Sequence, residues 1–239
     1  MTPLLSILIP TLPDRRPLLG RLWERLRPQV DAAGGAVAVL PLPDDGKLTV
    51  GRKRQLLLQA AATPYVAFVD DDDLVSDDYC PCVLEGLRAG ADVVGFRLNH
   101  YTDGVLTGHA IHSLRVSEWK YEHDPAAGLY FYERTPNHLN PIRRELALSI
   151  GYKSLDTGED ADYSRRLFER HGATMREHFV DAPLYHYFYR LREVVPIIVY
   201  DDDGNLTRAG AEKAIREGGS AVWGGKMCTR VEQLDEVEA

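Results

Sequence analysis

The sequence has 239 residues, of which 44% are apolar and 27% are charged. These values suit one folded domain of ordinary to large size, or one domain with a tail, and they argue against wholesale disorder. The formal net charge of -8 provides no general attraction to phosphate backbones, so bulk nucleic-acid binding is disfavoured. Three cysteines without zinc or redox spacing indicate a reducing compartment. We find no secretion signal and no apolar window of membrane-spanning length, so we expect a cytoplasmic protein with no membrane span.

Strands and helices are expected to alternate in the first part of the chain. Short apolar runs predict strands at 4–10, 36–40, 65–69 and 92–98. Apolar residues at helical spacing predict helices at 15–27, 50–62 and 76–89. This alternation predicts an α/β fold, a three-layer sandwich with a mostly parallel central sheet.

The second part of the chain has a looser pattern. It predicts a hairpin turning at Asp103-Gly104, a short helix with Asn140 as its N-cap and Pro141 as its first residue, and a helix at 161–171. Two separate strands are expected near 174–180 and at 184–190. Residues 100–138 are rich in aromatic side chains, which either stack on a ligand with flat apolar faces, such as a sugar, or form a second small core. We expect one main domain over 1–195 and an appendage over 196–239. The appendage is expected to contain a turn at 200–205, a short helix near 208–217 and an acidic end.

Four consecutive acids, Asp70 to Asp73, follow the strand at 65–69. Ligands of parallel α/β sheets bind beyond the carboxyl ends of the strands, which is where these acids are expected to lie. Clustered carboxylates suit a hard divalent cation that also binds phosphate oxygens. The alternative is a solvated loop, although so apolar a strand does not usually lead directly into one.

A second acidic pair, Glu159-Asp160, stands at the expected start of a helix. Acids in a first helical turn often complement the helix dipole, and they can also act as a general base at the mouth of a cleft. His186 is either a third metal ligand or a histidine within an aromatic cluster.

Four stretches occur in an order that resembles a known family. They read SILIPTLPDRR, DDG, VGRKRQLLLQAAATPYVAFVDDDD and GEDADYSRRL, and Asp72 and Asp160 are 88 positions apart. Together they resemble glycosyltransferase family 2, the inverting enzymes of the GT-A fold, and in particular its compact bacterial and viral members. The resemblance covers about residues 4–190 and implies the GT-A form of the α/β sandwich.

The resemblance also implies roles for individual residues. Asp160 matches the catalytic base, and Glu159 the residue that orients the acceptor or the loop. Asp72 matches the ligand of Mn²⁺ or Mg²⁺, with Asp70 and His186 as further metal ligands. Asp44 or Asp45 matches the acid that binds the nucleotide base, or is a plain turn residue. The full donor-binding set implied is Pro10, Thr11, Arg15, Asp44, Asp45, Gly51, Lys53, Arg54, Asp70 and Asp71.

The function implied is transfer of a sugar, with inversion, from a metal-bound nucleotide-diphosphate sugar to an acceptor hydroxyl. A UDP-sugar is the expected donor; a glycan, a lipid-linked sugar, a protein and a modified nucleobase remain possible acceptors. One alternative is a nucleotidyltransferase of related fold, which is disfavoured because residues 10–16 lack a glycine-rich phosphate loop. The other is a non-catalytic nucleotide-sugar-binding module, which is disfavoured by the presence of Asp160.

Overall fold

The computed structural model describes residues 2–189, 212, 215, 221–223 and 226–228. The chain divides into two compact units, Met1–Arg190 and Leu191–Ala239. In the second unit, β11 (Ala221–Trp223) pairs antiparallel with β12 (Lys226–Cys228). The expected boundary at 195, the turn at 200–205 and the acidic end lie outside the described residues. Of the expected helix near 208–217, residues 212 and 215 are described, and both are helical.

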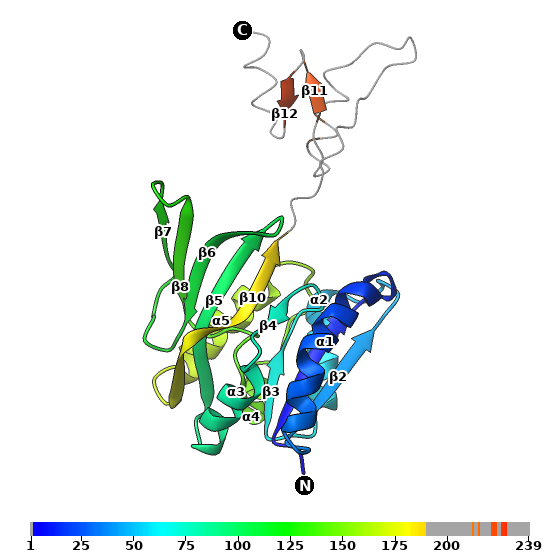
Figure 1. Cartoon of the computed structure of the whole chain (residues 1–239), viewed down its shortest axis with the longest axis vertical. Coiled ribbons are helices and arrows are strands. Elements are labelled where there is room, and N and C mark those ends of the chain that lie inside the picture. The colour runs from blue at the N-terminus through cyan, green and yellow to red at the C-terminus, as the bar shows by residue number, and fades with distance from the viewer. Residues whose placement is uncertain (1, 190–211, 213–214, 216–220, 224–225, 229–239) are drawn as a thin grey trace. The chain divides into compact units, whose positions relative to one another are not determined.

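The first unit begins with the expected alternation of strands and helices (Figure 1). Its first half contains β1 (Leu5–Thr11), the short 3₁₀ helix η1 (Pro13–Arg15), α1 (Arg16–Ala32), β2 (Val37–Pro43), α2 (Val50–Ala60), β3 (Tyr65–Phe68), β4 (Leu74–Val75) and α3 (Tyr79–Arg88). Its second half contains β5 (Val93–Thr102), β6 (Val105–His112), β7 (Lys120–Asp124), β8 (Leu129–Arg134), β9 (Ile142–Arg143), α4 (Arg144–Ile150), α5 (Glu159–His171) and β10 (Glu177–Tyr189).

Ten of the described strands form one mixed sheet in the order β2-β1-β3-β9-β5-β6-β8-β7, and β10 pairs with both β4 and β5. The pairs β1–β2, β1–β3, β5–β10 and β6–β8 are parallel. The turn between β5 and β6 has positive φ at Asp103 and Gly104, as the Asp-Gly hairpin predicts. The α/β sandwich expected from the sequence is confirmed, with a sheet that is mixed.

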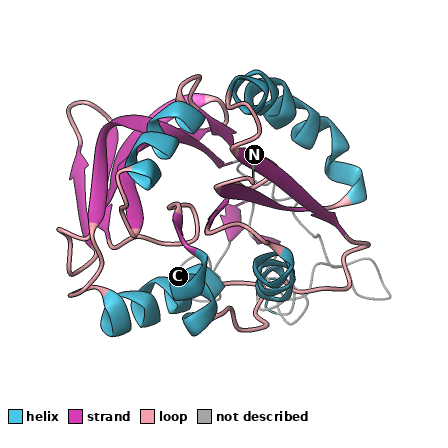
Figure 2. Cartoon of the chain, turned by 90° about the horizontal axis from the view of Figure 1, so that it is seen from below, coloured by secondary structure: helices cyan, strands magenta, loops and turns pink. Residues whose placement is uncertain are grey.

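Helices cover both sides of the sheet, as the view from below shows (Figure 2). Successive residues of a strand point to opposite faces, so β1 contributes to two hydrophobic cores. Leu5, Ile7 and Ile9 pack with α1 and α3 on one side, whereas Leu8 packs with α2, α4 and α5 on the other. A strand buried on both faces holds the residues at its carboxyl end in a fixed position, and Pro10, Thr11 and Leu12 at that end line the candidate site.

Two local predictions are wrong. The helix expected at Asn140-Pro141 begins at Arg144, because residues 142–143 form β9 between β3 and β5. The Asn140 side chain does not cap a helix; its Oδ1 accepts from the Asn137 amide and its Nδ2 donates to the Val94 carbonyl.

The two strands expected in the last part of this unit are one strand, β10. Irregular pairing between Val180 and Tyr185 absorbs the break at Pro183 that the sequence pattern shows. No helix among the described residues has both the length and the apolar character needed to cross a membrane.

Candidate active site

The acidic loop follows β3, which lies between β1 and β9 and is buried along its whole length. The chain turns at once after the strand, and the Asp73 amide donates to the Asp70 carbonyl at 3.2 Å. This turn sends the four aspartate side chains in different directions. Each of them therefore has a different set of partners.

Asp70 is held by Arg54 of α2. The guanidinium donates from Nη1 to Oδ1 at 3.0 Å and from Nη2 to Oδ2 at 3.2 Å, and His138 Nε2 lies 3.4 Å from Oδ2. Burial alone would raise the pKa of Asp70, but the charge of Arg54 and the His138 contact outweigh burial and hold this pKa far below its usual value. Asp70 is therefore a fixed carboxylate at any physiological pH.

Asp71 and Asp73 are both 1% exposed and bind the loop to the fold. Thr11 Oγ1 donates to Asp71 at 2.6 Å, and Arg15 Nη1 donates to it at 2.8 Å. Asp73 accepts from the Tyr185 hydroxyl at 2.8 Å and from the Phe188 amide at 2.7 Å. Asp71 thus connects the loop to the end of β1, and Asp73 connects it to β10.

Asp72 is the most exposed of the four acids, with 37% of its side chain accessible. Its described partner is Arg15, whose Nη1 lies 3.0 Å from Oδ2. Partial burial and the charges of Asp70 and Asp71 raise its pKa, against the opposing charge of Arg15. A carboxylate destabilised by its own neighbours is suited to a cation, because a positive charge removes that repulsion.

A pocket opens at this end of β1 and β3. Its walls contain eight of the residues expected to bind donor or metal, together with four residues that were not expected. The expected ones are Pro10, Thr11, Arg15, Lys53, Arg54, Asp70, Asp71 and Asp72; Asp73 also lines it, and the unexpected ones are Leu12, Val50, Tyr187 and Phe188. Three cationic side chains beside an exposed carboxylate suit a ligand that carries phosphate groups.

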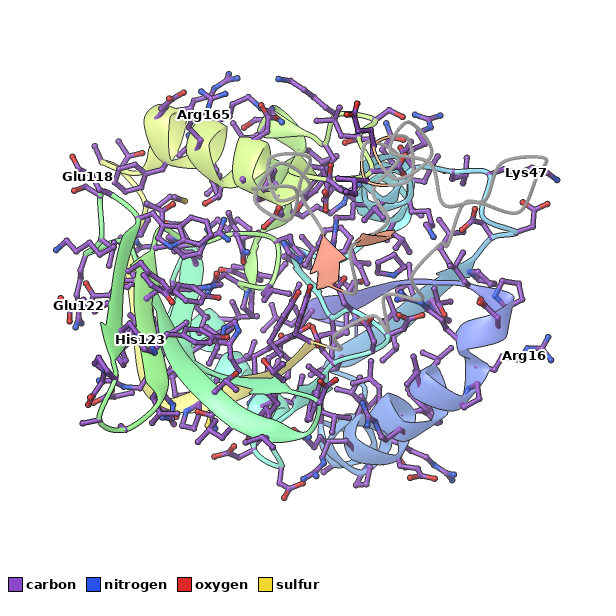
Figure 3. All side chains as sticks on the ribbon, turned by 90° about the horizontal axis from the view of Figure 1, so that it is seen from above. Arg16, Lys47, Glu118, Glu122, His123 and Arg165 are labelled. Atoms are coloured by element: carbon purple, nitrogen blue, oxygen red, sulfur yellow. The ribbon has the colours of Figure 1, made fainter. Side chains whose placement is uncertain are left out.

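Three expected donor-binding residues lie outside this lining. Asp44 is buried and pairs with Lys53, whose Nζ is 2.7 Å from its Oδ1; this contact and burial act in opposite directions, and the net effect lowers the pKa of Asp44. Asp45 is exposed and pairs with Lys47, which points outward in Figure 3. Gly51 packs against the 153–155 loop, where an added Cβ would lie 1.9 Å from the Lys153 carbonyl oxygen.

The second acidic pair begins α5, where Gly158 turns the chain with a φ of 76°. Glu159 is buried and accepts from Arg54 Nε at 3.2 Å. The same guanidinium therefore joins the helix start to Asp70. Glu159 and Asp70 lie on opposite sides of Arg54, which brings together two sites that are distant in the sequence.

Asp160 has a different environment from Glu159. Its side chain is 28% exposed, and Arg134 Nη1 lies 3.4 Å from its Oδ2. Burial alone would raise the pKa of Asp160, but His138, Arg134 and the Ala161 amide lower it to a net value below the usual one. Asp160 is thus an accessible carboxylate that is ionised at neutral pH.

Tyr187 lies between the two acidic groups. Burial and the negative charges of Asp73, Asp70, Asp72 and Asp160 raise the pKa of its hydroxyl to about 12. Because Tyr187 also lines the pocket, Asp160 lies on the same side of the fold as the acidic loop. Sequence reasoning missed Tyr187, and the alternation of LYHYFYR along a strand was the available signal.

The His186 backbone pairs with Leu74, beside the acidic loop, but its side chain points to the face opposite Tyr185 and Tyr187. It contacts the Tyr101 ring, with centroids 5.9 Å apart, and the charged groups acting on it are Arg25 and Asp77. Within the described residues, no three His, Cys, Asp or Glu side chains form a cluster that could hold a metal ion. The protein donors that fit a hard cation therefore reduce to the exposed carboxylate of Asp72, with ligand phosphate oxygens needed for the other positions.

Part of the chain is similar to a known protein family. Residues 37–147, which include α2, β3 and the acidic loop, match the model of the family described as Glycosyl transferase family 2. The match covers 111 of the 239 residues of the chain. No curated protein sequence matches the chain.

The fold of the chain is similar to solved structures of S. aureus TarS. The structure of TarS 1-349 in complex with UDP-GlcNAc has a TM-score of 0.53 and 15% identity, over 80% of this chain and 60% of that one. The structure of TarS 1-349 alone has a TM-score of 0.51 and 14% identity, over 77% and 60%. The chain thus spans about 60% of the length of these TarS chains, and at this level of identity the likeness concerns the fold.

Proposed function

We propose that the chain is a member of glycosyl transferase family 2 that moves a sugar from a nucleotide-diphosphate sugar to an acceptor hydroxyl, with inversion and with Asp160 as general base. The main support for the proposal is that two carboxylates of the site have pKa values shifted in opposite directions. Asp72 is exposed in a cationic pocket and its pKa is raised, whereas Asp160 is accessible nearby and its pKa is lowered. Such a division suits a charge-binding acid and a base.

The pocket would bind the diphosphate of the donor. Arg15 and Lys53 provide cationic side chains that can pair with phosphate oxygens, and Asp70 is held rigidly by Arg54 for contact with the ribose or the sugar. Asp72 would hold Mn²⁺ or Mg²⁺ together with those oxygens, and the ion supplies Lewis-acid stabilisation of the leaving diphosphate. The TarS structure in complex with UDP-GlcNAc makes UDP-sugars the first donors to test.

In the transfer step, the acceptor oxygen forms a bond to the anomeric carbon from the face opposite the diphosphate. The bond between that carbon and the diphosphate oxygen breaks, and its electron pair leaves with the nucleoside diphosphate. Asp160 accepts the proton of the hydroxyl, which is a task for a group that is ionised at neutral pH. Arg134 holds the Asp160 carboxylate at 3.4 Å and keeps its pKa low.

The test is binding and turnover of UDP-glucose, UDP-GlcNAc and UDP-galactose with and without Mn²⁺, measured by thermal shift and by release of UDP. We expect at least one donor to raise the melting temperature in the presence of Mn²⁺, and Asp72→Ala to remove this effect. Asp77→Ala is the matched control, because Asp77 is an exposed aspartate outside the pocket. Donor binding without UDP release in the presence of any acceptor tested would indicate a non-catalytic binding module. Release of pyrophosphate from a nucleoside triphosphate would indicate a nucleotidyltransferase.

A further inference from the structure

One face of the β6–β8–β7 part of the sheet carries a row of aromatic rings. Tyr130, Tyr132 and Arg134 alternate along β8, so their side chains share one face of the sheet. The two tyrosines are paired with small residues of β6: Gly108 lies beside Tyr130, and Ala110 lies beside Tyr132. A Cβ on Gly108 would lie 2.6 Å from the Tyr130 ring. The glycine therefore leaves the space in which this ring lies across the sheet.

The neighbouring strand extends the same row. Tyr121 of β7 pairs directly with Tyr132, and Trp119 precedes the strand by one residue. Ring centroids lie 5.5 Å apart for Trp119 and Tyr132, 6.4 Å for Tyr130 and Tyr132, and 6.0 Å for Tyr121 and Tyr130. The planes of the last two pairs differ by 7° and 23°, so the ring faces are nearly parallel.

The two outer rings of the row are exposed. Trp119 is 59% exposed and Tyr121 is 64% exposed, whereas Tyr130 and Tyr132 are half-buried and Tyr132 packs against the main core. The outer strand β7 is exposed along its whole length and ends the sheet order of the described strands. In Figure 3, Glu122 and His123 of β7 lie along the outer edge of the sheet, while Arg165 projects from α5. Large aromatic residues kept in water at a sheet edge indicate a binding surface.

The row reaches the candidate base. The Arg134 guanidinium lies 4.6 Å above the Trp119 ring, and its Nη1 is 3.4 Å from Asp160 Oδ2. A pocket beside Asp160 is lined by Trp119, Arg134 and Ser164 among others. At the other end, the Tyr132 hydroxyl is 2.8 Å from His100 Nε2, and the His100 ring is 5.0 Å from that of Tyr187, which lines the donor pocket. The aromatic row is thus continuous with both parts of the site.

We propose that this aromatic row, comprising Trp119, Tyr121, Tyr130 and Tyr132, binds the acceptor, and that the acceptor is a carbohydrate chain. This inference rests on the proposed function, because it assigns the substrate that Asp160 deprotonates. Sugar rings have apolar faces that pack on flat aromatic rings, and their hydroxyls remain available to polar groups at the edges. A chain lying along the row places its terminal sugar near Arg134 and Asp160.

The charges around the row favour a carbohydrate over a nucleic acid, whose bases would also stack on such rings. A nucleic-acid surface needs a concentration of cationic side chains to bind the phosphates. On the face that carries the rings, the guanidinium over Trp119 is that of Arg134, and it is already paired with Asp160. A cation paired with a carboxylate provides no track for a phosphate backbone.

The test is isothermal titration of the full chain with cellopentaose, chitopentaose, xylopentaose and laminaripentaose, and with a single-stranded thymidine decanucleotide. We expect at least one oligosaccharide to bind. Trp119→Ala and Tyr121→Ala should each weaken that binding about tenfold, which corresponds to one stacking contact of about 1.4 kcal/mol. Trp119→Phe should restore most of it, since it retains a ring.

Glu122→Ala is the matched control, because Glu122 is exposed on the same strand but alternates away from the rings. It should bind the oligosaccharide as the wild type does. Titration with UDP-sugars keeps the two proposals separate. Donor binding without binding of any oligosaccharide, unchanged affinity in Trp119→Ala, or preferential binding of the oligonucleotide would each overturn the carbohydrate row. Oligosaccharide binding without binding of any donor would support the row and contradict the proposed donor site.

Discussion

Arg54 donates two hydrogen bonds to Asp70, one from each terminal nitrogen, at 3.0 and 3.2 Å. Its third nitrogen, Nε, donates to Glu159 at 3.2 Å. Because burial excludes water from the guanidinium, these bonds replace its hydration, and its pKa is raised by Asp70 and Glu159 despite the opposing effect of burial. One side chain of α2 therefore fixes the distance between the acidic loop and the start of α5.

Replacing Arg54 should strongly destabilise the protein. Arg54→Ala leaves the buried Glu159 and the partly buried Asp70 without their shared cation, and loss of one partner of a buried ion pair costs about 3–5 kcal/mol. Urea denaturation measures the free energy of unfolding. Arg52→Ala is the control, because Arg52 is exposed on the same helix. Equal stability of the two variants would show that Arg54 does not organise the site.

The start of α2 should not tolerate a side chain at Gly51. An added Cβ meets the Lys153 carbonyl oxygen at 1.9 Å, and this is a backbone atom that cannot turn away. Gly51→Ala should lower the free energy of unfolding by about 1–3 kcal/mol. In Gly20→Ala, the matched helical control, the new Cβ has no atom within 4 Å, so stability should rise by about 0.5–1 kcal/mol. A gain of stability in Gly51→Ala would contradict the close contact.

His100 should make stability depend on pH. Burial and the charge of His109 lower its pKa from 6.5 to about 4. The unfolded chain then binds more protons than the folded chain between these values, so stability is complete above pH 6.5 and is lost as the pH falls towards 4. His100 should account for up to about 3 kcal/mol of that loss.

Urea denaturation across this pH range measures the effect. His100→Asn should flatten the dependence, whereas His123→Asn, which replaces an exposed histidine of β7, should leave it as in the wild type. An unchanged slope in His100→Asn would show that this histidine is not held neutral by burial.

Much of the first half of the fold follows from short-range pattern. The strands around residues 7 and 67 and the helices after them are apolar at the spacing of their own secondary structure, so local sequence predicts them. The predictions made from Pro183 and from Asn140-Pro141 were wrong because pairing with β5 determines the structure at both positions. Such pairing is a property of the whole sheet and has no local signal.

In the candidate site too, local sequence predicts one part of the arrangement and long-range contacts determine the other. The acids at 70–73 and 159–160 stand out in the sequence because carboxylates are costly to place together. Their separate partners were not predictable, because Tyr185 and Phe188 reach Asp73 from more than 110 positions away. In the structure Asp71 and Asp73 are buried while Asp72 is accessible.

Arg134 should set the pH dependence of catalysis through Asp160. Burial raises the pKa of Asp160, and His138 and Arg134 lower it to a net value below 3.8. Arg134→Gln removes one of these charges, so the acid limb of the profile of kcat/KM should move to higher pH. The rates at neutral pH should change less than the rates on the acid side. An acid limb in the same place in both proteins would exclude Arg134 as the residue that tunes the base.

The role of Asp160 is the central claim, and Asp160→Asn tests it most directly. Titration of a UDP-sugar measures donor binding, and UDP release with acceptor measures turnover. We predict donor affinity equal to that of the wild type and a loss of turnover of at least about 10²-fold, the usual contribution of a general base. Asp181→Asn, at an exposed position of β10, should retain full turnover. Wild-type turnover in Asp160→Asn would contradict the account.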